Sequence, residues 1–382
     1  MQSLRKQRLK ATLRAIRSFL IATLLGLFVG MLVILLAGYN PLEVYKEMFT
    51  KSFFKPFYLS QSLTRAMPII MASLATIISW RAGYINIGVE GQMIMGGLAA
   101  STVAIYLKGP SFLVFILALL AGLLAGALYA LLAALLNIYF NVSIVISTLM
   151  FNYIATYISS YFVNFPLRDR SGDGLAAQTV SLDESLHFPK IGEHPFTFNT
   201  AYIVVIIVLL LYLFYEKKLV FGYESKMTGL NPNFAKYGGV KEIPTMLKTM
   251  ALSGAIAGLA AFIEIFAVKY RFVDGMFTST SYAWTALMAA LIANLHPIGS
   301  FFVSIFLAGL QVGGQSIQRS FSIPLEMSTV IQASITLFVS VKLAFKLRRK
   351  RKTDTKDDQD SSGEIDSLDL KEVKDLERKG VK

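Results

Sequence analysis

The sequence contains no cysteine among its 382 residues, and this absence excludes disulfide bonds, thiol nucleophiles and metal sites ligated by cysteine. Charged residues are also scarce: they make up 16% of the chain, against roughly 25% in soluble domains. No phosphate-binding loop of the form G-x-x-x-x-G-K-[ST] occurs, and neither G-x-S-x-G nor H-E-x-x-H is found. The chain is therefore not expected to bind ATP or to carry out hydrolysis through any of these motifs.

What the sequence has instead is a series of apolar runs, and 54% of its residues are hydrophobic. These runs are about 20 residues long, which is the length a helix needs to cross a bilayer. A β-barrel would show short strands of alternating polarity instead. We predict an all-α, polytopic transmembrane helical bundle of about ten spans, some of them broken by Gly and Pro. The expected spans are 16–38, 59–80, 86–107, 111–136, 142–164, 200–215, 249–268, 282–295, 298–315 and 325–345.

Basic residues gather at the edges of the apolar runs. Six lie between Arg5 and Arg17, before the first run, and seven lie between Lys342 and Lys352, after the last one. This pattern follows the positive-inside rule and predicts that both termini are cytoplasmic. The net charge of +13 is thus attributed to membrane topology and not to nucleic-acid binding. No clear cleavage site follows the first apolar run, so it is read as an uncleaved span.

The same charge pattern divides the chain into regions. We expect a basic cytoplasmic N-terminus at 1–15, a membrane domain at 16–345 and a charged, disordered cytoplasmic tail at 346–382. Within the membrane domain, the basic loop 216–248 is predicted to be cytoplasmic, and the more acidic loop 165–199 extracellular.

Glycines spaced four apart recur inside the predicted spans and allow helix backbones to approach closely in lipid. Packing within the bundle is the preferred interpretation, and a dedicated dimer face is the alternative. The pairs are Gly26/Gly30, Gly122/Gly126, Gly254/Gly258 and Gly309/Gly313.

Three ionisable residues, Arg65, Glu90 and Glu264, fall inside predicted spans, where they are costly and suggest function. Arg65 suits either an anchor at the interface or a pathway role, and Glu264 is expected to find a packing partner elsewhere in the bundle. Glu90 lies between Gly88 and Gly91, which weaken a helix by roughly 1 kcal/mol each relative to alanine. Broken helices at membrane depth line cavities or lie buried in protein, so Glu90 is read as a pathway or gate element. A helix–helix contact in which Glu90 caps the backbone is the alternative.

Two further polar clusters interrupt apolar runs. Thr148 and Asn152 are four residues apart, on one face of a predicted helix. Trp284 and Asn294 belong to a second cluster that ends at His296, which precedes a proline and is expected at a helix end. The chain's three histidines form no ligand-spaced pair within a span, so no metal site is predicted.

The basic loop carries the signals of a short helix. Asn231 can cap a helix that starts at Pro232, and Gly238 and Gly239 can end it after Tyr237. A short, rigid helix of about two turns, facing the cytoplasm, would suit the docking of a soluble partner. An ordinary structured loop is the alternative.

The stretches "GYINIGVEGQMIMGG", "STLMFNYIA" and "GLNPNFAKYGGV" occur in the order typical of one family. Together they resemble the permease subunits of ABC importers of the simple-sugar and nucleoside class. They are most similar to the longer of the two permeases in nucleoside importers fed by basic-membrane-protein-type lipoproteins. The resemblance covers roughly residues 20–345, and "NIGVEGQ" stands where the ribose branch has a "GIDLSVG"-like sequence.

The resemblance implies roles for individual residues. It makes the helix at 232–237 a coupling helix and places Asn86, Glu90, Gln92 and Asn152 on or near the translocation path. The full set of candidate pathway residues adds members of the polar clusters: Asn86, Glu90, Gln92, Thr148, Asn152, Trp284 and Asn294. The candidate ATPase-coupling residues are Gly229, Asn231, Pro232, Phe234, Ala235, Lys236, Tyr237 and Gly239, of which Phe234, Ala235 and Tyr237 are expected to enter a groove on the ATPase.

The resemblance also implies partners. These are a second permease subunit forming a heterodimer, a cytoplasmic ABC ATPase that binds the ATP, an extracellular binding lipoprotein and a nucleoside substrate. No cofactor, metal or nucleic acid is expected on this chain, which would be a non-enzymatic, multi-pass protein of a bacterial cell membrane. A ribose-like sugar importer is the alternative within the family. A stand-alone secondary transporter is disfavoured because the spans contain few carboxylates, and an intramembrane enzyme because no nucleophile–base constellation is found.

Overall fold

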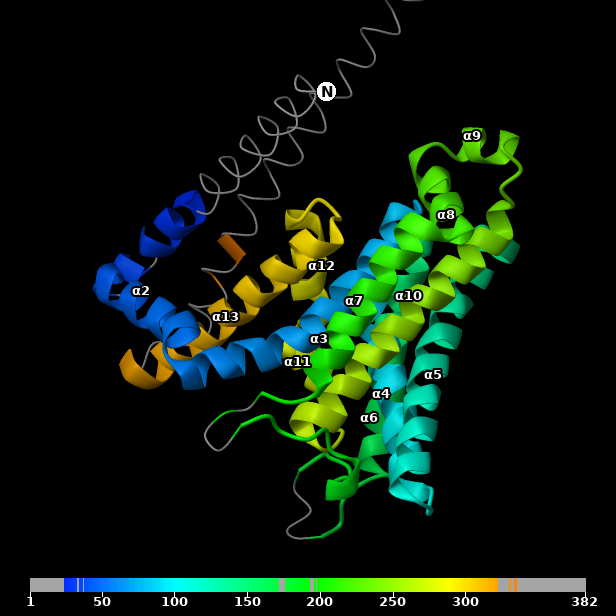
Figure 1. Ribbon diagram of the computed structural model, residues 1–382. Helices are drawn as coiled ribbons and strands as arrows, with labels where there is room; N and C mark the ends of the chain where they lie inside the picture. Colours follow the sequence, from blue (N-terminus) through cyan, green and yellow to red (C-terminus); the bar gives the residue numbers. More distant parts are fainter. Residues whose placement is uncertain are drawn as a thin grey trace, which may run out of the picture. The chain divides into compact units, whose positions relative to one another are not determined.

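The computed structural model describes residues 24–32, 34–36, 38–171, 176–192, 196, 198–321, 330 and 333–334. The chain forms two compact units, one of residues 1–30 with 333–382 and one of residues 31–332. In the first unit residues 24–30 are helical, and every helix labelled in Figure 1 belongs to the second. The predicted N-terminus 1–15, the tail 346–382, residues 16–23 of the first span and most of the span 325–345 lie outside the described residues.

The second unit is helical, which confirms the all-α fold class, and among the described residues β structure is limited to isolated bridges. Its helices are α2 (Pro41–Phe49), α3 (Pro56–Arg81), α4 (Val89–Tyr106), α5 (Ser111–Phe140), α6 (Ile144–Asn164), α7 (Ala201–Lys218), α8 (Val220–Leu230), α9 (Pro232–Tyr237), α10 (Glu242–Glu264), α11 (Met276–Thr280), α12 (Tyr282–Ile292) and α13 (Pro297–Phe321). Single π-helical turns follow α2 at Thr50–Phe54 and α10 at Ile265–Lys269, and a 3₁₀ turn forms at Glu184–Leu186.

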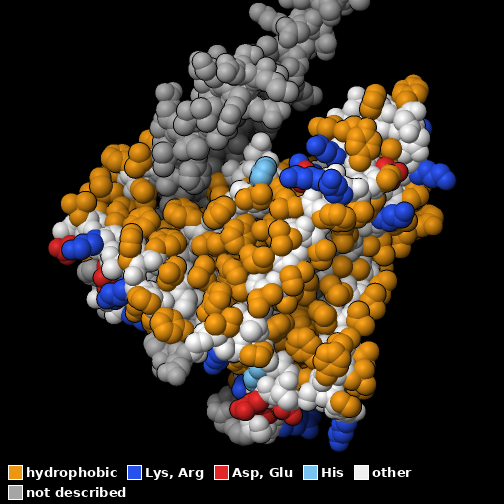
Figure 2. Space-filling model, viewed as in Figure 1, with side chains coloured by type: hydrophobic (Ala, Val, Ile, Leu, Met, Phe, Trp, Pro, Cys, Tyr) orange, Lys and Arg blue, Asp and Glu red, His pale blue; other side chains and the backbone are white. Residues whose placement is uncertain are grey.

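Four described helices are long and apolar enough to cross a membrane: Pro56–Arg81, Ser111–Phe140, Glu242–Lys269 and Pro297–Ser320. Figure 2 shows apolar side chains over the middle of one face, while charged side chains gather at its margins. Leucines such as Leu117, Leu124 and Leu128 on α5 are exposed on the chain, as expected for side chains that face lipid.

The centre of the unit is α10, which packs against α5, α3 and α4. Glycines make this packing close. A Cβ on Gly258 would overlap the carbonyl oxygen of Gly122, and a Cβ on Gly126 would overlap that of Gly254. The prediction that these glycine pairs pack inside the bundle is therefore confirmed.

Some elements differ from the predicted ones. Helix α2 forms in a stretch expected to be a loop, because Asn40 caps it and Pro41 suits its first position. Helix α8 likewise forms inside the loop 216–248. The crossing expected at 282–295 is broken: α12 has 11 residues and rises only about 16 Å, half of the roughly 30 Å hydrocarbon core. Helix α11 precedes it, separated by Ser281, which has φ +52°.

The two loops with opposite charge lie at opposite ends of the helices (Figure 1). Residues 177–188 of the outer loop are held against residues 266–274, which follow α10, by backbone hydrogen bonds that include Thr179 N–H to Phe272 O (2.9 Å) and Leu182 N–H to Tyr270 O (2.8 Å). Helices α8 and α9 lie at the other end, beyond the end of α7 and the start of α10. The two loops therefore lie at opposite ends of the bundle, and which end faces the cytoplasm stays a prediction.

Candidate functional site

A non-helical segment, residues 82–88, separates α3 from α4 at the place where the sequence predicted a broken helix. The chain turns at Gly83, which has φ +89°, and then runs through the fully buried Asn86. The Asn86 side chain accepts a hydrogen bond from Gly88 N–H (2.9 Å) and donates to Ser253 Oγ on α10 (3.1 Å). Its amide also exchanges hydrogen bonds of 3.1 and 3.2 Å with the amide of Gln92. Asn86 and Gln92 therefore fix the shape of the break.

Helix α6 supplies the remaining partners of this segment. Asn152 Oδ1 accepts from Gly91 N–H (2.8 Å) and Nδ2 donates to Ile87 O (3.1 Å), while Thr148 Oγ1 accepts from Ile87 N–H (3.2 Å). The first N–H groups of a helix have no partner within it, and no side chain of the local sequence caps α4. Asn152 thus caps α4 from another helix, and Thr148, four residues before it on α6, bonds the segment that leads into α4.

Glu90 lies in the first turn of α4 and is only 6% exposed. One carboxylate oxygen accepts a hydrogen bond from Thr278 Oγ1 on α11, at 2.7 Å. The alternative interpretation was a helix–helix contact in which the carboxylate caps the backbone; the hydrogen bond in the structure is a helix–helix contact, and its donor is a side-chain hydroxyl of α11. Two discontinuous elements, the break before α4 and the break between α11 and α12, therefore meet at Glu90.

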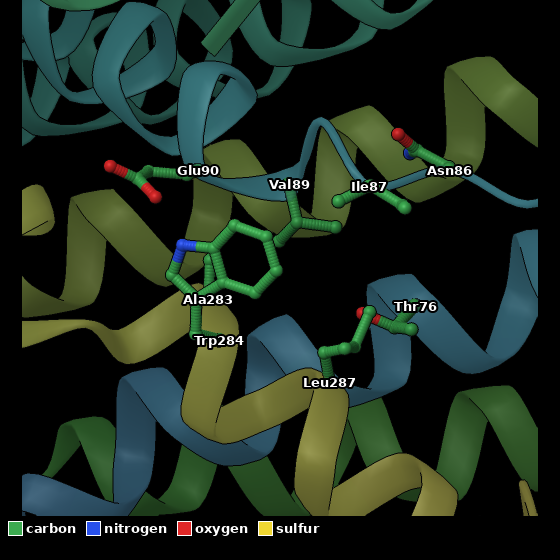
Figure 3. Close-up of a pocket in the computed structure, with 8 residues that line it drawn as sticks. All are labelled: Thr76, Asn86, Ile87, Val89, Glu90, Ala283, Trp284 and Leu287. Carbon is green, nitrogen blue, oxygen red and sulfur yellow. The ribbon is translucent and has the colours of Figure 1, made fainter. Parts of the chain in front are cut away.

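A small hollow lies between these elements (Figure 3). It has a volume of about 10 Å³, which is room for about one water molecule. Trp284 of α12, 41% exposed, lies beside Glu90 and Val89. The full lining is Thr76, Asn86, Ile87, Val89, Glu90, Ala283, Trp284 and Leu287. Pockets that bind small molecules measure about 300–1,000 Å³, so in this conformation the hollow is too small to hold a solute.

A second polar network joins α12 to α10, α13 and α3. Tyr282 OH donates to Glu264 Oε1 (3.1 Å), which gives Glu264 the partner elsewhere in the bundle that the sequence led us to expect. Arg65 Nε donates to Gln311 Oε1 (2.8 Å), and Gln311 Nε2 donates to Thr285 Oγ1 (3.0 Å). Both sets of hydrogen bonds include a residue of α12, namely Tyr282 and Thr285. This half-length helix is therefore held by polar side chains of α10 and α13.

Helix α9 has the bounds and caps that the sequence predicted. Asn231 Oδ1 accepts from Phe234 N–H (3.0 Å), Pro232 occupies the first turn, and Gly239 takes a positive φ of 84° after the helix. Phe234 and Tyr237 are 61% and 93% exposed. Ala235, in contrast, is 4% exposed, so it supports the helix from inside and is not available to a partner. Lys236, between Ala235 and Tyr237, is exposed as well.

A direct contact joins the end of the bundle that carries α8 and α9 to the break before α4. Gly229, near the end of α8, packs so closely on α3 that a Cβ there would overlap the carbonyl oxygen of Arg81. Arg81 also forms an ion pair with Glu216 of α7, with 2.7 Å between Nη1 and Oε2. The segment 82–88 therefore begins against α8, the helix that leads directly into α9.

The structure brings most of the candidate pathway residues together and sets one apart. Asn86, Glu90 and Trp284 line the hollow, and Gln92, Thr148 and Asn152 bond its walls. Asn294 instead lies exposed in the turn between α12 and α13, with φ +52°, a conformation that asparagine tolerates better than most residues. His296 caps α13 through Gly299 N–H (3.2 Å), as expected of a helix-end residue.

Sequence reasoning missed Thr278, Thr76 and Ser253. Each carries a hydroxyl within an apolar run, and nothing in the local pattern distinguishes it from the chain's other serines and threonines. One signal could have found Thr278. A buried Glu90 requires a hydrogen-bond donor, and α11 is a short polar stretch between apolar ones.

Comparison with known proteins places the chain among transport permeases. A family model described as "Branched-chain amino acid transport system / permease component" matches residues 58–340. A guanosine ABC transporter permease of Bacillus subtilis is 30% identical over 329 residues, covering 86% of this chain and 93% of that protein.

Two other relatives match over a similar length. A glucose ABC transporter permease of Haloferax volcanii is 28% identical, covering 86% of this chain and 88% of its own length. A nucleoside ABC transporter permease of Lactococcus lactis subsp. cremoris is 26% identical, with coverage of 85% and 90%. These matches confirm the resemblance that the three sequence stretches indicated. The chain belongs to the family of branched-chain amino acid transport system permease components, and it is a multi-pass cell-membrane permease of the ABC importer type and not an enzyme.

Proposed function

We propose that this chain forms one wall of the translocation path of an ABC importer for nucleosides. The observation that carries the substrate class is the near full-length match to a guanosine permease and a nucleoside permease. In this closed arrangement the amides of Asn86, Gln92 and Asn152 hold the break, and Glu90 is the lining group whose carboxylate can accept hydrogen bonds from the hydroxyls of a nucleoside. A simple sugar is the second candidate, favoured by the glucose permease among the relatives.

The proposed topology has ten crossings and two cytoplasmic termini. In it, α3, α5 and α7 run inward and α4, α6 and α10 run outward, while α11 and α12 together form one broken inward crossing. The opposite placement of the loop 165–199 and of α8–α9 supports this order. Substrate sites in transporters often lie where crossings are discontinuous, which is the case on both sides of Glu90.

The face that carries α11 and α12 is proposed to meet a second, different permease subunit across the path. Thr278, Ser279, Ser281 and Trp284 are exposed there, between helices that are otherwise apolar. Polar groups are expensive in contact with lipid tails, so this strip suits a water-filled path or a protein partner.

The cytoplasmic ATPase is proposed to bind at α9, because this chain has no phosphate-binding loop and ATP must be bound by another subunit. Phe234 and Tyr237 are the apolar side chains that α9 offers to a partner, with Lys236 beside them. The contact of Gly229 with the end of α3 supports a route by which motion at α9 reaches the break before α4. Coupling between sites must pass through such contacts.

The binding lipoprotein is proposed to dock at the outer end. There the turn from α4 to α5 and the segment 180–186 enclose a cleft of about 470 Å³, with Lys108 and Asp183 in its lining. The backbone hydrogen bonds that hold residues 177–188 against residues 266–274 support this surface from below. Asp183→Lys is expected to weaken lipoprotein docking while leaving ATPase binding unchanged.

Uptake measurements test the proposed substrate. Cells with and without the gene for this chain are given labelled guanosine, uridine, ribose and glucose in separate assays. Loss of nucleoside uptake on deletion, restored by the intact gene, is the expected result. Loss of sugar uptake with unchanged nucleoside uptake would favour the second candidate, and no change for any solute would refute both.

A further inference from the structure

Two buried carboxylates are each bonded by a hydroxyl of the same broken crossing. Glu90 of α4 accepts from Thr278 of α11, at 2.7 Å, and Glu264 of α10 accepts from Tyr282 of α12, at 3.1 Å. The second oxygen of Glu264 is buried without a hydrogen-bond partner among the described residues. The two carboxylates come from helices of the packed core, whereas both hydroxyls come from residues 276–292.

Left-handed backbone conformations mark three points along this crossing. Gly275 precedes α11 with φ +67°, Ser281 separates α11 from α12 with φ +52°, and Asn294 and Leu295 follow α12 with φ +52° and +59°. Non-glycine residues seldom adopt such conformations, and they cluster at switch regions. Helix α12 therefore has breaks at both ends, unlike the long helices around it.

The helix that follows is anchored. Gly309 and Gly313 of α13 pack so closely on Phe53, Ser52 and Met48 that a Cβ on either glycine would overlap them. Ser52 Oγ donates to Gly309 O (2.7 Å). Motion of α12 relative to this anchored helix would therefore bend the chain at Asn294–Leu295 and break the hydrogen bond from Gln311 of α13 to Thr285 of α12.

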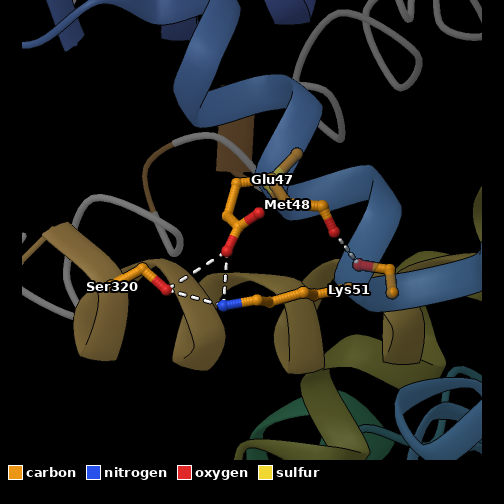
Figure 4. Close-up of polar contacts among 5 residues, drawn as sticks. Glu47, Met48, Lys51 and Ser320 are labelled. Carbon is orange, nitrogen blue, oxygen red and sulfur yellow. Dashed lines mark hydrogen bonds and ion pairs between the residues drawn. The ribbon is translucent and has the colours of Figure 1, made fainter. Parts of the chain in front are cut away.

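Polar contacts hold the far end of α13 as well (Figure 4). Lys51 forms an ion pair with Glu47 and donates to Ser320 Oγ (2.7 Å), which donates in turn to Glu47 Oε1 (3.3 Å). The hydrogen bond from Lys51 lowers the pKa of the Glu47 carboxyl below its usual value.

The geometry points to α11–α12 as a gate of the path, held shut over Glu90 by the hydroxyls of Thr278 and Tyr282. In the closed state Trp284 covers the hollow beside Glu90, which leaves room for about one water molecule. Release of the two hydroxyl–carboxylate bonds, together with the hydrogen bond between Gln311 and Thr285, lets α12 turn about Ser281 and Asn294–Leu295 and opens the path at Glu90. The inference rests on the proposed function for the identity of the path, but not for the identity of the solute.

Thiol labelling tests the gate directly, because the chain has no native cysteine. Ala283 lines the hollow and is 7% exposed, so a cysteine there is shielded while the gate is shut. The rate of modification of Ala283→Cys by a small, water-soluble methanethiosulfonate is measured in the full transporter in lipid. The added substitution Thr278→Val or Tyr282→Phe removes one hydroxyl and is expected to raise that rate about tenfold, equivalent to about 1.4 kcal/mol.

Thr280→Val is the matched control. Its hydroxyl also lies on α11 but bonds the backbone of its own helix, Met276 O at 2.8 Å, so the labelling rate should stay within about twofold of the parent. An unchanged rate in either test variant, with circular dichroism and elution like those of the parent, overturns the gate. Trp284 emission in a Trp80→Phe background gives a second readout, since the chain has two tryptophans, and it should shift in both test variants but not in the control.

This result is independent of the uptake assays. If labelling rises as expected while nucleoside uptake does not depend on the chain, the gate stands and the substrate proposal fails. If uptake depends on the chain while labelling is unchanged, the substrate proposal stands and the gate fails.

Discussion

Truncation of the exposed aromatic residues of α9 is expected to detach the ATPase without unfolding the permease. Tyr237 is 93% exposed and Phe234 is 61% exposed, so Tyr237→Ala and Phe234→Ala remove few contacts within the chain. Aromatic side chains at the centre of an interface cost about 2 kcal/mol or more when truncated to alanine. Each substitution should therefore weaken ATPase association by about 30-fold.

The assay is the affinity of the purified permease in lipid nanodiscs for the isolated ATPase subunit, together with the ATPase activity that binding stimulates. Phe112→Ala provides the control: this aromatic residue is 77% exposed but lies at the start of α5, at the other end of the bundle. Thermal unfolding of all three variants should match that of the parent chain. Unchanged affinity in both α9 variants would show that α9 is not the docking helix.

Three further substitutions test the site and its support. Glu90→Gln keeps a hydrogen-bond acceptor for Thr278 but removes the charge, so solute uptake should fall while membrane levels stay normal, as measured by uptake and immunoblot. Asn152→Leu leaves Gly91 N–H and Ile87 O unpaired at about 1–3 kcal/mol each, and should lower the melting temperature markedly in a thermal-shift assay. Gly258→Leu drives a side chain into the backbone of α5, so little folded protein should elute in size-exclusion chromatography, whereas intact protein would contradict the close packing.

The elements whose signals are local could be predicted from the sequence. Helix α9 was placed from Asn231, Pro232 and the glycines after Tyr237, because caps and turn residues act within a few positions. A break near Glu90 was expected from Gly88 and Gly91, and the structure has it at residues 82–88, while Glu90 and Gly91 belong to the first turn of α4. Helix α8 was missed because its polar, basic composition resembles that of a loop.

The contacts that make the site could not be predicted. The bond between Thr278 and Glu90 joins residues 188 positions apart, and the cap supplied by Asn152 joins residues 61 positions apart. Periodicity and capping patterns contain no information about which distant helix supplies a partner. The orientation of Ala235 was predicted wrongly for a related reason: a six-residue helix has no periodic pattern long enough to show which side faces the chain.

Reconstitution tests the central claim most directly. Proteoliposomes containing this chain, the second permease and the ATPase are supplied with the loaded binding protein outside and ATP inside, and uptake of labelled guanosine is followed. We predict accumulation that requires hydrolysable ATP, is unaffected by proton and sodium ionophores, and is lost with Tyr237→Ala. Accumulation by this chain alone, driven by an ion gradient without the ATPase, would contradict the account and identify a secondary transporter.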